Sequence, residues 1–286
     1  MLEANKLKFA IPAKGRLMEP AIELLHKAGY KFRAKGRNLY ATCTNDDIIF
    51  IFIRPDDIPV LVDKGVVDLG ITGSDLVIEK NADVAEILPL GFGKCRLCLA
   101  VKNTSKFENL NDFKDKVIAT SFVNITSKFF KDNKVDVKCV GMNGSVEITI
   151  DLNLAEAIVD IVETGDSLRD NNLRVFCDIG NYETVLVANR NLSQNSKIEQ
   201  IARRINGILI AGKYSLLEYN IKEELLEHAE KITPGFESPT VSKLDQAGWV
   251  AVRAMVMKKD VVYVMDTLEQ AGATAIIETE VRNCRL

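Results

Sequence analysis

The sequence feature that most constrains the fold is a run of six large apolar residues, IIFIFI, at residues 48–53. A strand that is buried on both faces is apolar at every position, so this run predicts an inner strand of a parallel sheet. A strand-like and a helix-like segment precede it at 8–11 and 17–28, and a helical segment and a strand follow at 57–64 and 69–72. This alternation predicts an α/β fold, in which crossover helices join parallel strands.

The same pattern repeats in the middle of the chain, and the last third differs from it. Two apolar segments, CRLCLAV (95–101) and TVLVANR (184–190), bracket the middle block and are interpreted as crossings between one lobe and a second lobe inserted into it. After a helix predicted at 197–214, the order strand, helix, strand, helix, strand predicts a ferredoxin-like module. The predicted domains are lobe I at residues 1–96 and 186–213, lobe II at 97–185, and a C-terminal domain at 214–286.

Charge and composition exclude several classes of protein. The 286-residue chain carries 37 basic and 40 acidic residues, a balance that favours neither a nucleic-acid-binding protein nor a membrane-surface protein. The N-terminus lacks the pattern of a signal peptide, and no apolar run is long enough for a membrane helix, so we expect a cytoplasmic protein. Cys95 and Cys98 lie three residues apart in a predicted strand, where their side chains point to opposite faces, so no zinc or redox site is expected.

The sharpest local signal is the segment DIVETGDSL at residues 160–168. An apolar strand is followed by a turn whose glycine, Gly165, lets the backbone approach an anion, and by a helix start whose amides point outward. This arrangement is typical of a phosphate-monoester site, with Asp160 and Glu163 placed to accept hydrogen bonds from ribose hydroxyls or to meet a metal. A strand, a turn and a capped helix without any ligand is the alternative interpretation. The predicted contacts are Asp160, Glu163, Thr164, Gly165, Asp166 and Ser167.

Two further segments predict contacts at the carboxyl ends of strands, where open α/β sheets bind ligands. In the segment KGRL (14–17), Arg16 can grip a phosphate through two hydrogen bonds and Lys14 adds a point charge, although a solvated basic turn is the simpler alternative. In the segment 53–75, Arg54 ends a buried strand, and Gly73, Ser74 and Asp75 join the next strand to a helix.

One nucleotide-binding motif is rejected. The segment GILIAGK (207–213) has the spacing of a P-loop, but Tyr214 stands where the motif requires Ser or Thr, and the segment lies in an amphipathic helix.

Taken in order, several segments closely resemble the ATP phosphoribosyltransferase family, and the resemblance runs nearly from end to end. They are AKGRL, IRPDDIPVLVDKGVVDLGITGSD, GKCRLCLAV, VIATSF, NGSVE, DIVETGDSLRDNNL and TPGFESPT. The C-terminal domain makes the chain similar to the long form of that family. The resemblance implies two lobes like those of periplasmic binding proteins with the active site in their cleft, and a ferredoxin-like (ACT-like) domain that binds histidine as a feedback inhibitor.

The resemblance also implies the reaction. Members of the family transfer the 5-phosphoribosyl group from phosphoribosyl pyrophosphate to N1 of ATP, with Mg²⁺, in the first step of histidine biosynthesis, and they form dimers that assemble into hexamers. The adenine N1 lone pair is free, so no strong base is needed, which agrees with a chain that has two histidines and no evident pair of nucleophile and base.

Residue roles follow from the resemblance as expectations. Arg16, Arg37 and Arg54 are expected to face pyrophosphate and the ATP phosphates, with support from Lys14. Thr120 and Ser121, at a strand-to-helix junction, are weaker candidates for the same cleft, and the metal ligands remain unassigned.

In the C-terminal domain, the residues expected around histidine are Asn220, Phe236, Thr240, Met255 and Ala275. Asn220 stands where some long-form relatives have an aspartate, and an amide gives the histidine amino group no ion pair. Sensitivity to histidine is therefore expected to be weaker, or to depend on another carboxylate such as Glu218. A plain dimerisation module is the alternative for this domain.

Two alternatives for the whole chain remain at this stage. The first is a two-lobed small-molecule binding or regulatory protein without catalysis, and the second is an inactive homologue that serves as a regulatory subunit.

Overall fold

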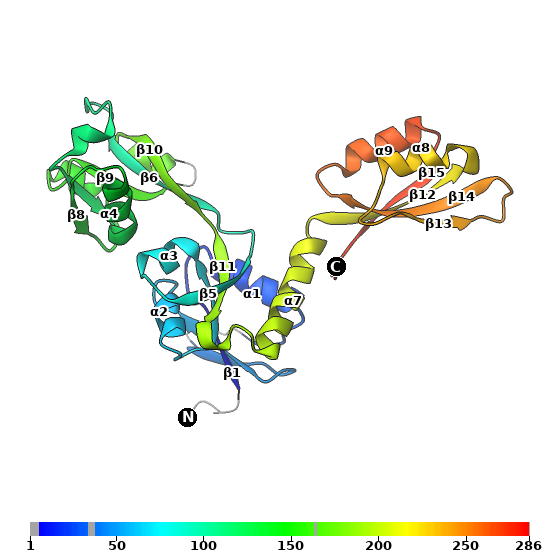
Figure 1. Ribbon diagram of the computed structural model, residues 1–286, viewed down its shortest axis with the longest axis horizontal. Coiled ribbons are helices and arrows are strands. Elements are labelled where there is room, and N and C mark those ends of the chain that lie inside the picture. The colour runs from blue at the N-terminus through cyan, green and yellow to red at the C-terminus, as the bar shows by residue number, and fades with distance from the viewer. Residues whose placement is uncertain (1–5, 34–37, 163–164, 286) are drawn as a thin grey trace. The chain divides into compact units, whose positions relative to one another are not determined.

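The computed structural model describes residues 6–33, 38–162 and 165–285, and it separates into two units, Met1–Ala202 and Arg203–Leu286 (Figure 1). Three predicted site residues, Arg37, Glu163 and Thr164, lie outside the described residues. Among the helices of the described part, none combines the length and the apolar character that a membrane crossing requires.

The first unit begins with a sheet in the order β2-β3-β1-β4-β11-β5, which together with α1, α2 and α3 we name the first lobe. β1 pairs in parallel with β3 and β4, while β11 runs antiparallel to both β4 and β5. The predicted strand at 48–53 is confirmed as β3, an inner strand of this sheet. The strands are β1 (Leu7–Pro12), β2 (Tyr40–Thr42), β3 (Ile48–Ile53), β4 (Leu69–Gly73), β5 (Val84–Pro89) and β11 (Thr184–Asn189), and the helices are α1 (Met18–Lys27), α2 (Ile58–Asp63) and α3 (Ser74–Glu79).

A second sheet, in the order β10-β6-β9-β7-β8, forms what we name the second lobe together with α4, α5 and α6. Its strand β6 is buried on both faces, because Leu97 and Leu99 belong to one core cluster while Cys98 and Ala100 belong to another. The strands are β6 (Cys95–Lys102), β7 (Val117–Thr120), β8 (Lys138–Gly141), β9 (Ala157–Val162) and β10 (Leu173–Tyr182), and the helices are α4 (Val123–Asp132), α5 (Ile148–Asp151), α6 (Asp166–Asp170) and the 3-10 turn η1 (Leu110–Phe113).

The chain passes between the two sheets twice. It leaves the first sheet after β5, enters the second at β6, and returns between β10 and β11 through the single residue Glu183. β6 and β10 are antiparallel neighbours, and their register pairs Arg96 with Asn181 and Cys95 with Tyr182. Residues that are about 85 positions apart in sequence therefore lie side by side where the chain crosses between the sheets.

The second unit contains an antiparallel sheet in the order β13-β14-β12-β15, with α8 and α9. Burial alternates along β12 and β14, so one face of the sheet packs into a core with both helices. This is the predicted ferredoxin-like module. The helix predicted at 197–214 ends earlier, because Tyr214 already belongs to β12. The elements are α7 (Ser196–Ala211), which spans the division between the units, β12 (Tyr214–Lys222), α8 (Leu226–Ile232), β13 (Thr240–Lys243), β14 (Trp249–Met257), α9 (Val261–Gln270) and β15 (Thr274–Glu280), with the 3-10 turn η3 (Glu223–Leu225). The 3-10 turn η2 (Arg190–Leu192) follows β11 in the first unit.

Candidate active site

A small cavity of the second lobe is lined by the end of β9 and the start of α6. Gly165 has a φ of +83°, the left-handed backbone conformation that L side chains rarely adopt. An added Cβ would meet nothing closer than 4.0 Å, so it is the backbone angle and not the lack of space that requires glycine. The cavity has a volume of about 230 Å³ and is lined by Glu147, Asp160, Ile161, Val162, Gly165, Asp166, Ser167 and Leu168.

Two of the polar side chains in this cavity already have partners. The Ser167 hydroxyl donates a hydrogen bond of 2.6 Å to Oε1 of Glu147, and Asp166 forms an ion pair with Arg169 one turn later in α6. Glu147 was not among the predicted contacts, although it ends the segment NGSVE on which the family resemblance partly depends. A ligand at Gly165 would therefore meet the Ser167 hydroxyl beside an acidic neighbour.

Two carboxylates lie near each other in this cavity. Burial raises the pKa of Asp160, the nearby Glu147 charge raises it further, and a hydrogen bond from the Ile161 amide opposes both effects. Oδ1 of Asp160 accepts that hydrogen bond at 2.8 Å. Sugar hydroxyls or a cation would relieve the repulsion between the two carboxylates.

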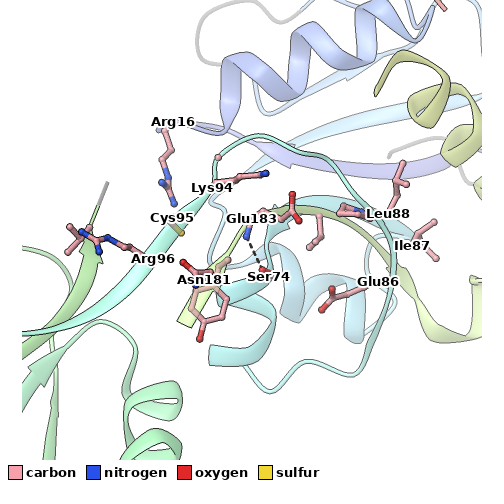
Figure 2. Close-up of a pocket in the computed structure, with 15 residues that line it drawn as sticks. Arg16, Ser74, Glu86, Ile87, Leu88, Lys94, Cys95, Arg96, Asn181 and Glu183 are labelled. Carbon is pink, nitrogen blue, oxygen red and sulfur yellow. Dashed lines mark hydrogen bonds between the residues drawn. The ribbon is translucent and has the colours of Figure 1, made fainter. Parts of the chain in front are cut away.

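A much larger cavity, of about 930 Å³, opens beside the crossings between the lobes (Figure 2). Arg16 reaches it from the turn after β1, and Ser74 from the start of α3. Lys94 and Arg96 flank Cys95 at the beginning of β6 and add two more positive charges. Neither residue was among the contacts predicted from the sequence. The lining residues are Arg16, Ser74, Glu86, Ile87, Leu88, Pro89, Gly93, Lys94, Cys95, Arg96, Val162, Asn181, Tyr182, Glu183 and Val185.

The two cavities are neighbours, because Val162 at the end of β9 lines both of them. Arg96 forms an ion pair with Asp178 on the adjacent strand β10, with Nη1 and Oδ1 3.3 Å apart. An anionic ligand in the larger cavity would meet Arg16 and Lys94 together with Arg96, whose charge is partly offset by Asp178.

The turn from β4 into α3 is tightly built. The Ser74 amide donates to the Glu183 carbonyl at 2.9 Å, and the Glu183 amide donates back to the Ser74 hydroxyl at 3.2 Å. A Cβ on Gly73 would overlap the carboxylate of Asp75, which is 4% exposed. Burial raises the pKa of Asp75, while a hydrogen bond from the Leu76 backbone and the charge of Arg16 act in the opposite direction. Asp75 is thus a buried carboxylate next to Ser74, and the charge of Arg16 favours its ionised form.

Two of the other predicted cations, Lys14 and Arg54, lie outside these two cavities. Both are exposed, Lys14 after β1 and Arg54 after β3.

Thr120 is completely buried, and its hydroxyl accepts a hydrogen bond of 2.9 Å from the Phe122 amide at the start of α4. Its placement gives no support to a direct ligand contact. Ser121, the next residue, is half-buried.

A third cavity, of about 260 Å³, lies on the sheet of the second unit. Its lining residues are Glu218, Tyr219, Asn220, Thr240, Ser242, Ala251, Val252, Arg253, Ala275 and Ile277. Three of the five residues predicted around histidine are therefore brought together here, Asn220, Thr240 and Ala275. Ala275 has a φ of +50°, beside an irregularity in the pairing of β12 with β15. Such strain in a non-glycine residue is typical of binding sites.

The remaining two lie elsewhere in the second unit. The Phe236 ring packs edge-on against Tyr214 at 4.6 Å, and Met255 pairs with Leu216 away from the cavity. Glu218, the alternative partner for a histidine amino group, already accepts a hydrogen bond of 2.8 Å from Nε of Arg253.

The residues of the first unit fit a Mg²⁺ whose ligands are mainly phosphate oxygens of the substrates. Among the described residues no three His, Cys, Asp or Glu side chains gather to hold a metal. Mg²⁺ in phosphate-transfer sites is usually held by one or two carboxylates together with substrate oxygens and water. Asp160 and Glu147 supply such a pair of carboxylates.

Comparison with solved structures agrees with the fold. A chain described as the "ATP phosphoribosyl transferase (HisG:HisZ) complex from Thermotoga maritima" is 30% identical with a TM-score of 0.61, and the match covers 70% of this chain and 98% of that one. A substrate-binding protein of an amino acid ABC transporter, 14% identical, matches with a TM-score of 0.50 over 72% of this chain and 94% of its own. That second likeness concerns the fold alone. The predicted fold of two binding-protein-like lobes and a ferredoxin-like module is confirmed.

Sequence comparison covers nearly the whole chain. The ATP phosphoribosyltransferase of Rhodopirellula baltica is 43% identical over 280 residues, which make up 98% of this chain and 94% of that protein. The ATP phosphoribosyltransferase of Streptomyces avermitilis is 41% identical over 98% of this chain and 100% of its own length. The family model "HisG: ATP phosphoribosyltransferase" matches residues 54–207, and "HisG, C-terminal domain" matches residues 211–283. The chain belongs to the ATP phosphoribosyltransferase family, in the form that carries its own C-terminal domain.

Proposed function

We propose that this enzyme transfers the 5-phosphoribosyl group from phosphoribosyl pyrophosphate to N1 of ATP across the two neighbouring cavities of the first unit. The products are phosphoribosyl-ATP and pyrophosphate, and the reaction is the first step of histidine biosynthesis. The observation that carries this proposal is the shared wall at Val162, which puts a cavity suited to a sugar phosphate beside a cation-lined cavity large enough for a nucleotide. The family membership supplies the identity of the reaction.

The donor belongs at the Gly165 turn. Amides that follow a left-handed glycine can converge on a phosphate, and the Ser167 hydroxyl adds a donor once it leaves Glu147. Asp160 then faces the ribose hydroxyls as an acceptor. We assign Glu163, Thr164 and Asp166 to the same site on the basis of the sequence pattern.

The leaving group and the ATP phosphates belong in the larger cavity. Arg16 can bind two phosphate oxygens at once, and Lys94 and Arg96 add positive charge from the start of β6. Ser74 lines the same cavity, with Gly73 and Asp75 supporting it from the turn below. We retain Arg37, Arg54, Lys14 and Ser121 as further contacts, and we expect Thr120 to act only by stabilising the start of α4.

The chemistry needs positioning and charge rather than a strong base. The N1 lone pair of adenine forms a bond to C1′ of the ribose, and the bond from C1′ to the diphosphate oxygen breaks with its electron pair on pyrophosphate. Positive charge develops on the ribose ring near the Asp160 carboxylate, and negative charge develops on the leaving group near Arg16, so both changes are stabilised by groups already in place. The proton that adenine must lose can leave to water.

We expect Mg²⁺ as the cofactor. When bound, it offsets part of the diphosphate charge, and Asp160 and Glu147 would hold it on the protein side.

In the second unit, we propose that the cavity around Asn220 binds histidine as a feedback inhibitor. The ion pair between Glu218 and Arg253 at its edge offers a carboxylate for an amino group and a guanidinium for a carboxylate. We further propose dimers and hexamers of this chain, a cytoplasmic location, and the domain division at residues 1–96 with 186–213, 97–185 and 214–286.

One assay tests the proposed reaction. The purified chain is mixed with ATP, phosphoribosyl pyrophosphate and Mg²⁺, and pyrophosphate release is followed together with the absorbance change of the adenine product. Release that requires all three components is expected. Binding of ATP or donor without release would instead favour a two-lobed binding protein, and release without ATP would indicate simple hydrolysis of the donor.

A further inference from the structure

The helix α4 of the second lobe receives its N-terminal cap from the first lobe. The Glu79 carboxylate, at the last residue of α3, accepts hydrogen bonds from the Asn124 amide at 3.0 Å and from the Ile125 amide at 3.1 Å. Glu79 is 7% exposed, so these bonds are formed away from solvent. The first amides of a helix have no partner within the helix, and a carboxylate is a strong cap for them.

The sequence of α4 does not supply this cap itself. The residue at its N-cap position, Phe122, has no side-chain acceptor, and the first turn has no acidic residue. The Thr120 hydroxyl accepts hydrogen bonds from the Phe122 amide at 2.9 Å and from the Thr126 hydroxyl at 3.5 Å, and neither donor is an amide of the first turn of α4. The next amides are therefore capped by a side chain that lies 45 or more positions earlier in the sequence.

Two further contacts reinforce the same junction. The Asn124 side chain donates back to the Glu79 carbonyl at 2.6 Å, which makes the interaction reciprocal. Leu76, one turn before Glu79 on the same face of α3, packs against the core cluster of the second lobe that contains Phe122 and Ile125.

The opposite end of α3 lies at the larger cavity. Ser74 lines that cavity, and the buried Asp75 carboxylate interacts with the charge of Arg16. Because α3 has six residues, its two ends are only about 9 Å apart. One short helix thus joins the contact between the lobes to the wall of the cavity that Ser74 shares with Arg16.

We propose that Glu79 is a positioning residue of the transferase: by capping α4 across the lobes it fixes α3, and through α3 it holds the Ser74–Asp75 turn and Arg16 in register with the second lobe. This inference rests on the proposed function for its kinetic consequences. The donor cavity at Gly165 is built within the second lobe alone, whereas the larger cavity takes residues from both lobes. Loss of the cap should therefore impair the use of ATP more than the binding of donor.

The test compares Glu79→Ala and Glu79→Gln in the full chain. For Glu79→Ala we expect a fall in kcat/KM for ATP of roughly tenfold, the effect of one lost charge-assisted hydrogen bond, with donor affinity measured by calorimetry unchanged. Glu79→Gln keeps one acceptor oxygen and should recover part of the loss. Hydrogen exchange should become faster in Glu79→Ala at residues 124–125 and also at residues 73–76 in the other lobe.

Asp112→Ala is the matched control. The Asp112 carboxylate also caps two amides, those of Glu108 at 2.8 Å and Asn109 at 3.0 Å, but entirely within the second lobe. This variant should lower Tm without changing kcat/KM or the hydrogen exchange of residues 73–76.

Unchanged hydrogen exchange at residues 73–76 in Glu79→Ala would overturn the proposal whether or not the chain releases pyrophosphate. Equal kinetic losses in the two variants, or a parallel loss of donor affinity in Glu79→Ala, would overturn it as well. A wild-type chain that releases no pyrophosphate would refute the proposed function, and the exchange result would still decide the role of Glu79.

Discussion

The two cavities of the first unit are built in different ways. The smaller cavity comes largely from residues 160–162 at the end of β9 and residues 165–168 at the start of α6, with Glu147 added from another segment. The larger cavity takes its lining from the turn after β1, the start of α3, strand β5, the start of β6 and the ends of β10 and β11. The first is a local structure, and the second exists only when both sheets have formed and the chain has crossed between them.

This difference predicts how each cavity responds to substitution. A local cavity should lose ligand binding when its own backbone is altered, while the structure of the rest of the molecule should change little. A composite cavity should be sensitive both to the cations in its wall and to distant residues, such as Glu79, that hold its parts together.

The largest effect is expected for Gly165→Val. A β-branched side chain cannot easily hold the φ of +83°, so the amides that should converge on the donor phosphate turn away. Loss of two such hydrogen bonds to a charged group corresponds to a fall in donor affinity of about a thousandfold. Calorimetric titration with donor measures this, and circular dichroism should show a folded chain. Gly29→Val, at a φ of +92° with no atom within 4 Å of the added Cβ, imposes the same backbone strain outside both cavities. Normal donor affinity in Gly165→Val would refute the assignment of this turn.

Arg16→Ala tests the composite cavity. Removal of one group that stabilises developing charge typically lowers turnover by about a hundredfold, and donor affinity should fall much less than kcat. Arg16→Lys should recover little activity, because an ammonium cannot form the paired hydrogen bonds of a guanidinium. Steady-state kinetics with ATP varied at saturating donor gives the comparison. If Arg16→Lys is as active as the wild type, positive charge alone is sufficient and the proposed pair of hydrogen bonds from the guanidinium is wrong.

Asp160→Asn separates the effect of this carboxylate on stability from its effect on activity. Burial and the Glu147 charge raise the pKa of Asp160, so its ionisation is disfavoured in the folded state. Its contribution to stability is therefore present at acid pH and is lost as pH rises through the raised pKa. As pH rises through this pKa, the Tm of the wild type should fall relative to the Tm of Asp160→Asn. At neutral pH, kcat/KM of the variant should be roughly tenfold lower, because the ribose loses a charged acceptor. If Asp160→Asn loses activity while its Tm depends on pH as in the wild type, ionisation of Asp160 does not destabilise the folded chain.

The same contrast explains what the sequence could predict. The Gly165 turn was predictable because a strand, a glycine and a helix start follow one another within nine residues. Arg96 and Asn181 lie together in the wall of the larger cavity because β6 and β10 pair in one register, and that pairing has no signal in either segment alone.

Missed strands follow a related pattern. β5 and β10 are only partly buried along most of their length, and all four residues of β13 are exposed, so none of them shows the apolar run that revealed β3. Glu147 was missed because an acidic residue in a loop has no periodicity, and its contact with Ser167 depends on the packing of two separate segments.

The smallest effect concerns the cavity of the second unit, which is also composite because β12, β13, β14 and β15 all contribute to it. Asn220→Asp would place a carboxylate where a histidine amino group is expected. Since charge-assisted hydrogen bonds are about twice as strong as neutral ones, histidine should bind a few-fold more tightly, as measured by calorimetry on the full chain. Glu218→Gln is the companion variant, because it breaks the bond to Arg253 and removes the carboxylate already present. If Glu218→Gln abolishes binding while Asn220→Asp changes nothing, Glu218 is the partner of the amino group. If neither substitution alters histidine binding, the cavity around Asn220 is not the inhibitor site, and the strained Ala275 beside it needs another explanation.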